Sequence, residues 1–221
     1  MSSVKLISYS QPHDDLKEQG IVTLDHLIAF CARVSNPDNQ NNTETMNKLI
    51  SYMIRHKHFS PFEMVHICME ITTTRDIARQ ILRHRSFSFQ EYSGRYAEMN
   101  ASEELRELRL QDPKNRQNSI STDDVDTERY WIQLQRQVLN TAYQNYNKAL
   151  GAGVAKEQAR ALLPEGLTES TMYMAGTLRS WIHYVEVRTE EGVQKEHKEI
   201  AEKVKAVLVD LHPFLKDYFN G

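Results

Sequence analysis

The chain changes its hydrophobic period near Thr74, and this change limits the folds that it can adopt. Residues 64–73 alternate between apolar and polar side chains, a pattern that predicts a β-strand. From residue 74 to residue 85 the apolar side chains return at helical spacing, with Thr74 and Asp76 as starting signals. We therefore expect a strand that passes directly into a helix, as in folds that combine both kinds of element.

Helical spacing dominates most of the remaining chain. We expect helices at residues 23–34, 43–56, 125–150, 156–163, 177–188 and 193–211, and short strands at residues 4–9 and 168–174. Thr43 is the expected N-cap of the second of these helices, and Gly151 and Gly153 end the longest one. Residues 100–124 are polar and charged, so we expect a loop there with room for one short helix.

The order of these elements indicates the fold class. Only 6 prolines and 8 glycines occur among 221 residues, which argues against long linkers. The length itself suits one domain or two small ones. We expect an α+β fold in which a single, helix-rich domain over residues 1–221 surrounds a small antiparallel sheet.

Charge and composition argue against several classes of protein. The formal net charge of −3 is unlike that of general nucleic-acid binders, which are basic. No apolar run approaches about 18 residues, so we expect no membrane span. Residues 1–11 lack the regions of a secretory signal, and the cytoplasm is therefore the expected location. Cys31 and Cys68 have no paired spacing, which indicates free thiols in a reducing compartment.

The segment from Arg83 to Tyr96 carries the strongest functional signal. It contains three arginines, one histidine and three serines, with aromatic residues between them. A core segment would not tolerate this polarity, and a solvated surface has no need of so many aromatic rings. Guanidinium forks bind phosphates and carboxylates, and aromatic rings can cover a flat ligand. The segment therefore predicts a pocket for a phosphorylated, planar, heteroaromatic ligand.

The residues before and within this segment extend the prediction. Three arginines stand at i, i+4 and i+8 of the expected helix, namely Arg75, Arg79 and Arg83. A solvated charged face is the alternative, because like-charge pairs cost only about 0.2–0.5 kcal/mol each. The basic residues that follow favour an anion site. Gln80 offers a donor and an acceptor to the edge of a pyrimidine, and Gly94, in an expected turn over residues 90–96, lets backbone N–H groups approach a phosphate.

Residues 83–96 also resemble the signature of the flavin-dependent thymidylate synthases (ThyX family). They match the pattern RHRxxSxxxxSxRY at every fixed position. Further family-like segments are ARVS at 32–35, HxSPFE at 58–63, AR at 159–160 and QxE at 194–196. The chain departs from the family pattern at four positions: Met64, Gln90, Ala155 and Gly192. The resemblance extends from Ser35 to Glu196 and so covers most of the chain.

The resemblance implies an enzyme that methylates dUMP to dTMP with bound FAD, using 5,10-methylenetetrahydrofolate and NADPH as co-substrates. It implies a homotetramer with sites at subunit interfaces. The implied FAD contacts are Ser35, Ser60, Glu63, Arg83, His84, Arg85, Gln90, Glu91, Arg179 and His183. The expected dUMP contacts are Gln80, Arg83, Glu91, Ser93, Gly94, Arg95, Arg160 and Arg188.

Three residues are catalytic candidates within this resemblance. Arg188 reaches the uracil, where a cation can stabilise negative charge on the carbonyl oxygens. His183 lies near the flavin ring. Ser93 as a covalent nucleophile is a weaker hypothesis, because no base is adjacent. Neither cysteine lies in a cationic motif that would activate it, so the cofactor must carry the difficult step. No metal-ligand spacing such as HExxH occurs, and we expect no metal site.

Two other functions fit parts of the sequence. A non-enzymatic nucleotide- or RNA-binding module would use the arginine row together with aromatic rings that stack on bases. The acidic net charge and the additional family-like segments oppose it. A flavoprotein reductase without methyl transfer is the third possibility, and the presence of Arg95, Arg160 and Arg188 argues against it.

Overall fold

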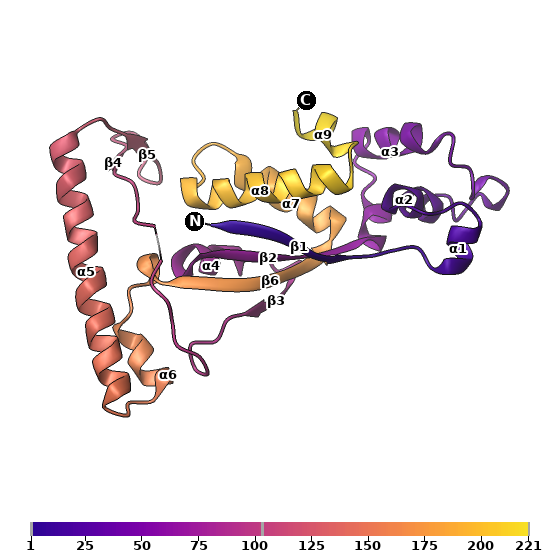
Figure 1. The fold of residues 1–221 in the computed structure, drawn as a ribbon. Coiled ribbons are helices and arrows are strands. Elements are labelled where there is room, and N and C mark those ends of the chain that lie inside the picture. Colours follow the sequence, from indigo (N-terminus) through magenta and orange to yellow (C-terminus); the bar gives the residue numbers. More distant parts are fainter. Residues whose placement is uncertain (1, 103, 221) are drawn as a thin grey trace.

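A four-stranded antiparallel sheet forms the centre of the computed structural model, which describes residues 2–102 and 104–220 (Figure 1). The strands lie in the order β1–β2–β6–β3. Their bounds are β1 (Ser3–Tyr9), β2 (His66–Thr74), β3 (Ser88–Glu91) and β6 (Glu169–Thr177). Because β2 pairs with β6 along its whole length, from His66 opposite Thr177 to Thr74 opposite Glu169, the sheet joins the two halves of the chain.

Helices surround this sheet, which confirms the expected α+β class. They are α1 (Asp14–Glu18), α2 (Leu24–Ala32), α3 (Met46–Arg55), α4 (Arg75–Ile81), α5 (Val125–Gly151), α6 (Lys156–Ala159), α7 (Leu178–Thr189), α8 (Lys195–Leu211) and α9 (Leu215–Asn220). Figure 1 shows α7 and α8 along one side of the sheet, and α5 standing at its end with α6 against it. Among the described residues, no helix is both long enough and apolar enough to cross a membrane.

The core lies between the sheet and the helices that cover it. Ile67, Met69 and Ile71 of β2 are buried at alternate positions, as the period-two pattern predicts. Trp181 of α7 is fully buried against this face, and its indole N–H donates to the Ile67 carbonyl over 3.1 Å. The apolar side chains of β2 are buried at every second position, and those of α4 are buried at helical spacing in the same core. The change of hydrophobic period at Thr74 therefore marks the passage from strand to helix.

Two expectations about helix ends are wrong. α4 ends at Ile81 instead of residue 85, because the N–H groups of Arg83 and His84 bond three residues back, to Gln80 and Ile81. Arg83 therefore lies beyond the helix and does not extend the row of guanidinium groups. The second wrong expectation concerns the start of α3. This helix begins at Met46 with Thr45 in the N-cap position, so Thr43 is not its N-cap.

The loop expected at residues 100–124, with room for one short helix, instead contains a hairpin of β4 (Arg109–Gln111) and β5 (Ser119–Ser121). Asp112 explains the turn, since its carboxylate accepts from the backbone N–H groups of Lys114 and Asn115 and from the Asn118 amide. The preceding segment is held by α5. Gln135 is buried there and exchanges two hydrogen bonds with the backbone of Arg106, at 2.7 and 2.9 Å.

Candidate active site

Phe87 anchors the arginine-rich turn to the core. Its ring packs edge-on against Trp181, with centroids 4.7 Å apart, and lies directly over Gly176 of β6. A Cβ at position 176 would stand 2.4 Å from the Phe87 ring, so only glycine permits this approach. Because Phe87 points inward, the predicted ligand arginines Arg83 and Arg85 on either side of His84 remain exposed. The sequence thus combines a fixed backbone with accessible guanidinium groups.

Arg188 and His84 are brought into direct contact, although 104 residues separate them. Arg188 lies in the last turn of α7, and its Nε–H donates to His84 Nε2 over 2.8 Å. The pKa of His84 is lowered to about 4, chiefly by burial and also by the charges of Arg188 and His183. The imidazole is therefore a neutral acceptor, and it orients the Arg188 guanidinium through a single well-formed hydrogen bond.

Several predicted cofactor contacts line three hollows that share walls, which we call the long groove. Its sections measure about 380, 530 and 480 Å³. Phe59 and Arg179 are common to the first and second sections, and Tyr52 is common to the second and third. The predicted contacts along the groove are Glu63, Arg179 and His183 in the first section, Ser60 in the second and Ser35 in the third.

An internal ion pair spans the first section of the long groove. The Arg179 guanidinium contacts the Glu63 carboxylate, and both side chains are substantially exposed. Glu63 belongs to the 3-10 helix Ser60–Met64, which Pro61 starts in its first turn. His183 lies one turn after Arg179 on α7 and is 3.9 Å from Glu186. The groove therefore combines a cation, an imidazole and the apolar ring of Phe59.

A second group of predicted residues meets around α6. Arg95 lies 3.5 Å from the Glu157 carboxylate, and Arg160 Nε donates to the Glu157 carbonyl over 3.3 Å. Gly94 is buried between Met99 and Arg160, and an added Cβ would be 2.6 Å from the Met99 sulfur. The Ser93 hydroxyl accepts from the Arg95 backbone N–H over 3.4 Å. We call this group the Arg95–Arg160 cluster.

The remaining predicted contacts lie on β3 and α4. The Ser170 hydroxyl of β6 donates to the Glu91 carboxylate over 2.6 Å, which fixes Glu91 across the strand pair. Gln90 is exposed opposite Tyr173. Arg79 pairs with the Glu165 carboxylate, so an acidic partner reaches the arginine face that the sequence left without one. Gln80 uses its amide in contacts with Gln194 and His197.

The structure does not bring all of these residues to one point of a single chain. Arg188 lies in the last turn of α7 and contacts His84, whereas the Arg95–Arg160 cluster contacts Glu157 of α6. Figure 1 shows α7 beside the sheet and α6 against the end of α5. The predicted convergence of these three arginines therefore stays a prediction.

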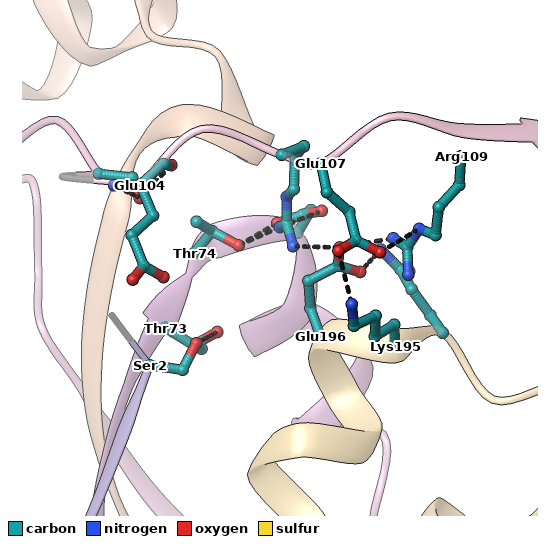
Figure 2. A network of polar contacts seen from close by, with 12 residues as sticks. Ser2, Thr73, Thr74, Glu104, Glu107, Arg109, Lys195 and Glu196 are labelled. Carbon is teal, nitrogen blue, oxygen red and sulfur yellow. Dashed lines mark hydrogen bonds and ion pairs between the residues drawn. The ribbon is translucent and has the colours of Figure 1, made fainter. Parts of the chain in front are cut away.

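Sequence reasoning missed a polar cluster at the start of α8. Arg109 donates to the Glu196 carboxylate over 2.5 Å, and Arg106 pairs with both Glu196 and Asp76, at 3.4 and 2.8 Å (Figure 2). Burial raises the pKa of Glu196, but hydrogen bonds from Arg109 and Gln194 and the Arg106 charge outweigh it and hold the pKa at about 2. The only sequence signal was the QxE spacing, because the two arginines come from a polar loop.

The fully buried His197 and the half-buried His84 predict how stability depends on pH. The pKa values of His84 and His197 are lowered to about 4 and about 3, chiefly by burial. Because the unfolded chain binds protons near pH 6.5, their contribution to stability is complete above that pH and is lost as the pH falls toward 4. We expect the urea midpoint of unfolding to fall between pH 6.5 and 5, before carboxylates titrate.

Two variants test this pH dependence: His197→Gln removes a buried histidine, and His13→Gln is the matched control at an exposed position. His197 is fully buried, whereas the His13 side chain is 76% exposed. His197→Gln is expected to flatten the pH dependence of the urea midpoint, and His13→Gln is expected to leave its slope unchanged. An equal slope in all three proteins would show that the buried imidazoles do not produce it.

Comparisons with known proteins identify the family of this chain. The family described as thymidylate synthase complementing protein matches residues 21–214. The probable flavin-dependent thymidylate synthase of Paramecium bursaria Chlorella virus 1 is 46% identical over 211 residues, which cover 96% of this chain and 95% of that protein. The flavin-dependent thymidylate synthase of Synechocystis sp. is 46% identical over 210 residues, 95% of each chain.

A solved structure shares the fold. The UMP/dUMP methylase PolB from Streptomyces cacaoi, crystallised with 5-Br dUMP, superposes with a TM-score of 0.82 at 24% identity over 100% of this chain and 95% of that chain. The family match extends over most of the sequence, and the relatives from the Chlorella virus and from Synechocystis sp. align nearly from end to end. The chain therefore belongs to the family of flavin-dependent thymidylate synthases.

Proposed function

We propose that this enzyme methylates dUMP to dTMP, taking the methylene carbon from 5,10-methylenetetrahydrofolate and reducing equivalents from NADPH through bound FAD. Membership of the flavin-dependent thymidylate synthase family supports the reaction. The observation that carries the proposal is the long groove, along which five predicted cofactor contacts from residue 35 to residue 183 lie in sequence-distant segments. A nucleotide-binding module without activity has no such support.

The residues of the long groove fit a flavin dinucleotide. Arg179 can bind a phosphate, Ser35 and Ser60 offer hydroxyl groups, and Phe59 provides an apolar wall for a ring. When bound and reduced, FAD supplies the hydride that the reaction needs. The chain offers no activated thiol for the step instead, because burial raises the pKa of both Cys31 and Cys68.

Arg188 is the proposed electrostatic catalyst. Transfer of a one-carbon unit to uracil C5 places negative charge on the ring carbonyl oxygens, and a fixed guanidinium stabilises that charge. His84 holds Arg188 by its Nε, which leaves the two terminal nitrogens of the guanidinium for the substrate. His183, on the same helix, borders the long groove at the place proposed for the flavin ring.

The Arg95–Arg160 cluster is the proposed site for the dUMP phosphate. Two guanidinium groups and the Ser93 hydroxyl surround a buried glycine, so backbone and side-chain donors lie together. The separation of this cluster from Arg188 supports a homotetramer in which neighbouring subunits complete each site. Exposed apolar side chains on α5 offer a surface for such contacts, namely Val125, Tyr130 and Val138.

Replacement of Arg160 is expected to act on substrate affinity. Arg160→Ala removes a charged donor from the proposed phosphate site, and hydrogen bonds to charged groups contribute about 1.5–3 kcal/mol. We expect the KM for dUMP to rise by about tenfold or more while kcat changes little. Steady-state kinetics with Lys156→Ala, which removes a neighbouring cation bonded to the Tyr96 carbonyl, provides the control. A fall in kcat at unchanged KM would reverse the assignment.

The proposed reaction has a direct test. The purified protein, reconstituted with FAD, is mixed with dUMP labelled with tritium at C5, methylenetetrahydrofolate and NADPH. Release of tritium to water together with bleaching of the flavin by NADPH supports the proposal. Bleaching without tritium release would indicate a reductase, and the absence of both would exclude the flavin enzyme.

A further inference from the structure

Five side chains from three helices form one chain of hydrogen bonds, which we call the Gln80 relay. It begins at Tyr184 of α7, passes through His197 of α8 and Gln80 of α4, and ends at the start of α8 with Gln194 and Glu196. The successive distances are 3.1 Å from Tyr184 Oη to His197 Nε2, 3.1 Å from His197 Nδ1 to Gln80 Oε1, 2.7 Å from Gln80 Nε2 to Gln194 Oε1 and 3.0 Å from Gln194 Nε2 to Glu196 Oε2.

Glu196 sets the direction of the relay. Its carboxylate is held by Arg109 and Arg106 (Figure 2), and its pKa of about 2 keeps it ionised under working conditions. An ionised carboxylate only accepts hydrogen bonds. Gln194 must therefore turn its NH₂ group toward Glu196, which leaves its carbonyl oxygen facing Gln80.

The same alternation continues into the protein interior. Gln80 donates to Gln194 through Nε2, so its oxygen faces His197 and accepts from Nδ1–H. His197 is fully buried, and burial lowers its pKa to about 3, so the ring carries one proton. With that proton on Nδ1, Nε2 accepts from the Tyr184 hydroxyl. Glu196 thus determines the amide orientation of Gln80 and the tautomer of His197.

Gln80 retains one hydrogen-bonding function at each end of its amide. The nitrogen carries a second hydrogen, and the oxygen has a second lone pair. Uracil presents N3–H, a donor, beside a carbonyl oxygen, an acceptor, and this pair matches the amide in one orientation. Cytosine has an unprotonated N3 and a 4-amino group, so it matches the amide only after a flip. An amide free to flip would accept both bases.

We propose that Glu196, acting through Gln194, locks the Gln80 amide in the orientation that accepts uracil and rejects cytosine. Glu196 and Gln194 are positioning residues in this proposal, and Gln80 is the residue that touches the base. The inference rests on the proposed contact between Gln80 and dUMP. It adds a determinant of base specificity, in which Glu196 and Gln194 act on Gln80 without contacting the substrate.

The test compares equilibrium binding of dUMP and dCMP to the FAD-loaded enzyme. Glu196→Gln replaces the obligate acceptor with an amide that both donates and accepts, so the relay can run in either direction. A matched donor and acceptor pair discriminates between bases by about 1–3 kcal/mol, so we expect the ratio of dCMP to dUMP dissociation constants to fall about tenfold. Glu107→Gln removes a carboxylate from the same cluster, where it contacts Lys195 and Arg109, and is expected to leave the ratio unchanged.

A second variant keeps the test valid if Glu196→Gln fails to fold. Gln194 is exposed, so Gln194→Met interrupts the relay without disturbing the core, and it is expected to lower the ratio to a similar extent. An unchanged ratio in Gln194→Met, or in folded Glu196→Gln, would overturn the relay alone. A wild-type enzyme that does not bind dUMP would overturn the proposed function and with it the relay's role, so the two failures are distinguishable.

Discussion

Arg188→Ala is expected to lower kcat by about 10²–10³, the effect typical of removing one preorganised donor to developing charge. The guanidinium is fixed by its hydrogen bond to His84, a neutral imidazole, so it need not reorganise when charge develops on the uracil. The KM for dUMP is expected to change much less. Single-turnover oxidation of the reduced enzyme on mixing with dUMP and methylenetetrahydrofolate measures the affected step.

Two further variants separate charge from geometry at this position. Arg188→Lys keeps a cation but loses the planar fork, and it is expected to recover only part of the rate. His84→Gln keeps an acceptor near Arg188 and is expected to lower kcat less than Arg188→Ala does. An Arg188→Ala enzyme with normal kcat and a raised KM would assign Arg188 to binding and not to catalysis.

Trp181→Ala is expected to lower the free energy of unfolding by about 3–5 kcal/mol, as is typical when a large aromatic side chain is removed from a core. Trp181 is fully buried, packs edge-on against Phe87 at 4.7 Å and Tyr184 at 5.9 Å, and donates to the Ile67 carbonyl. The variant leaves a cavity and removes the indole donor to the Ile67 carbonyl of β2. Urea denaturation followed by far-UV circular dichroism measures the loss.

The same substitution tests how the core supports the proposed ligand site. Phe87 loses its main aromatic partner, so the turn that presents Arg83 and Arg85 loses its anchor. Trp181→Phe keeps most of the packing while losing the indole N–H, and it is expected to destabilise less. Equal stability of wild type and Trp181→Ala would show that this contact is not central to the core.

Local sequence patterns were sufficient for the elements that carry their own signals. The alternation before Thr74 predicted β2, and the spacing of α5, α7 and α8 predicted helices close to their observed bounds. The hairpin at residues 109–121 was missed because a side chain, Asp112, builds its turn and no apolar period marks its strands. The end of α4 was missed because Phe87 is drawn into the core, which no local pattern reveals.

Candidate site residues could be predicted only where they belong to a recognisable sequence motif. The signature segment identified His84, but its contact with Arg188 depends on how α7 packs. No sequence pattern indicated that Arg106 and Arg109 contact α8, because both lie in a polar loop. Gln135 of α5 holds the backbone of this loop, and Arg106 then reaches Glu196 of α8. Partners supplied across the fold cannot be read from spacing along the chain.

Two of the proposed ligand arginines are already paired with carboxylates. Arg179 contacts Glu63 and Arg95 lies 3.5 Å from Glu157, so an anion that binds either guanidinium group competes with a carboxylate of the same chain. A nucleotide phosphate that binds there must displace the carboxylate. The planar guanidinium group favours oxyanions, which accept two parallel hydrogen bonds, over spherical halides. We therefore expect chloride to compete poorly for either guanidinium group.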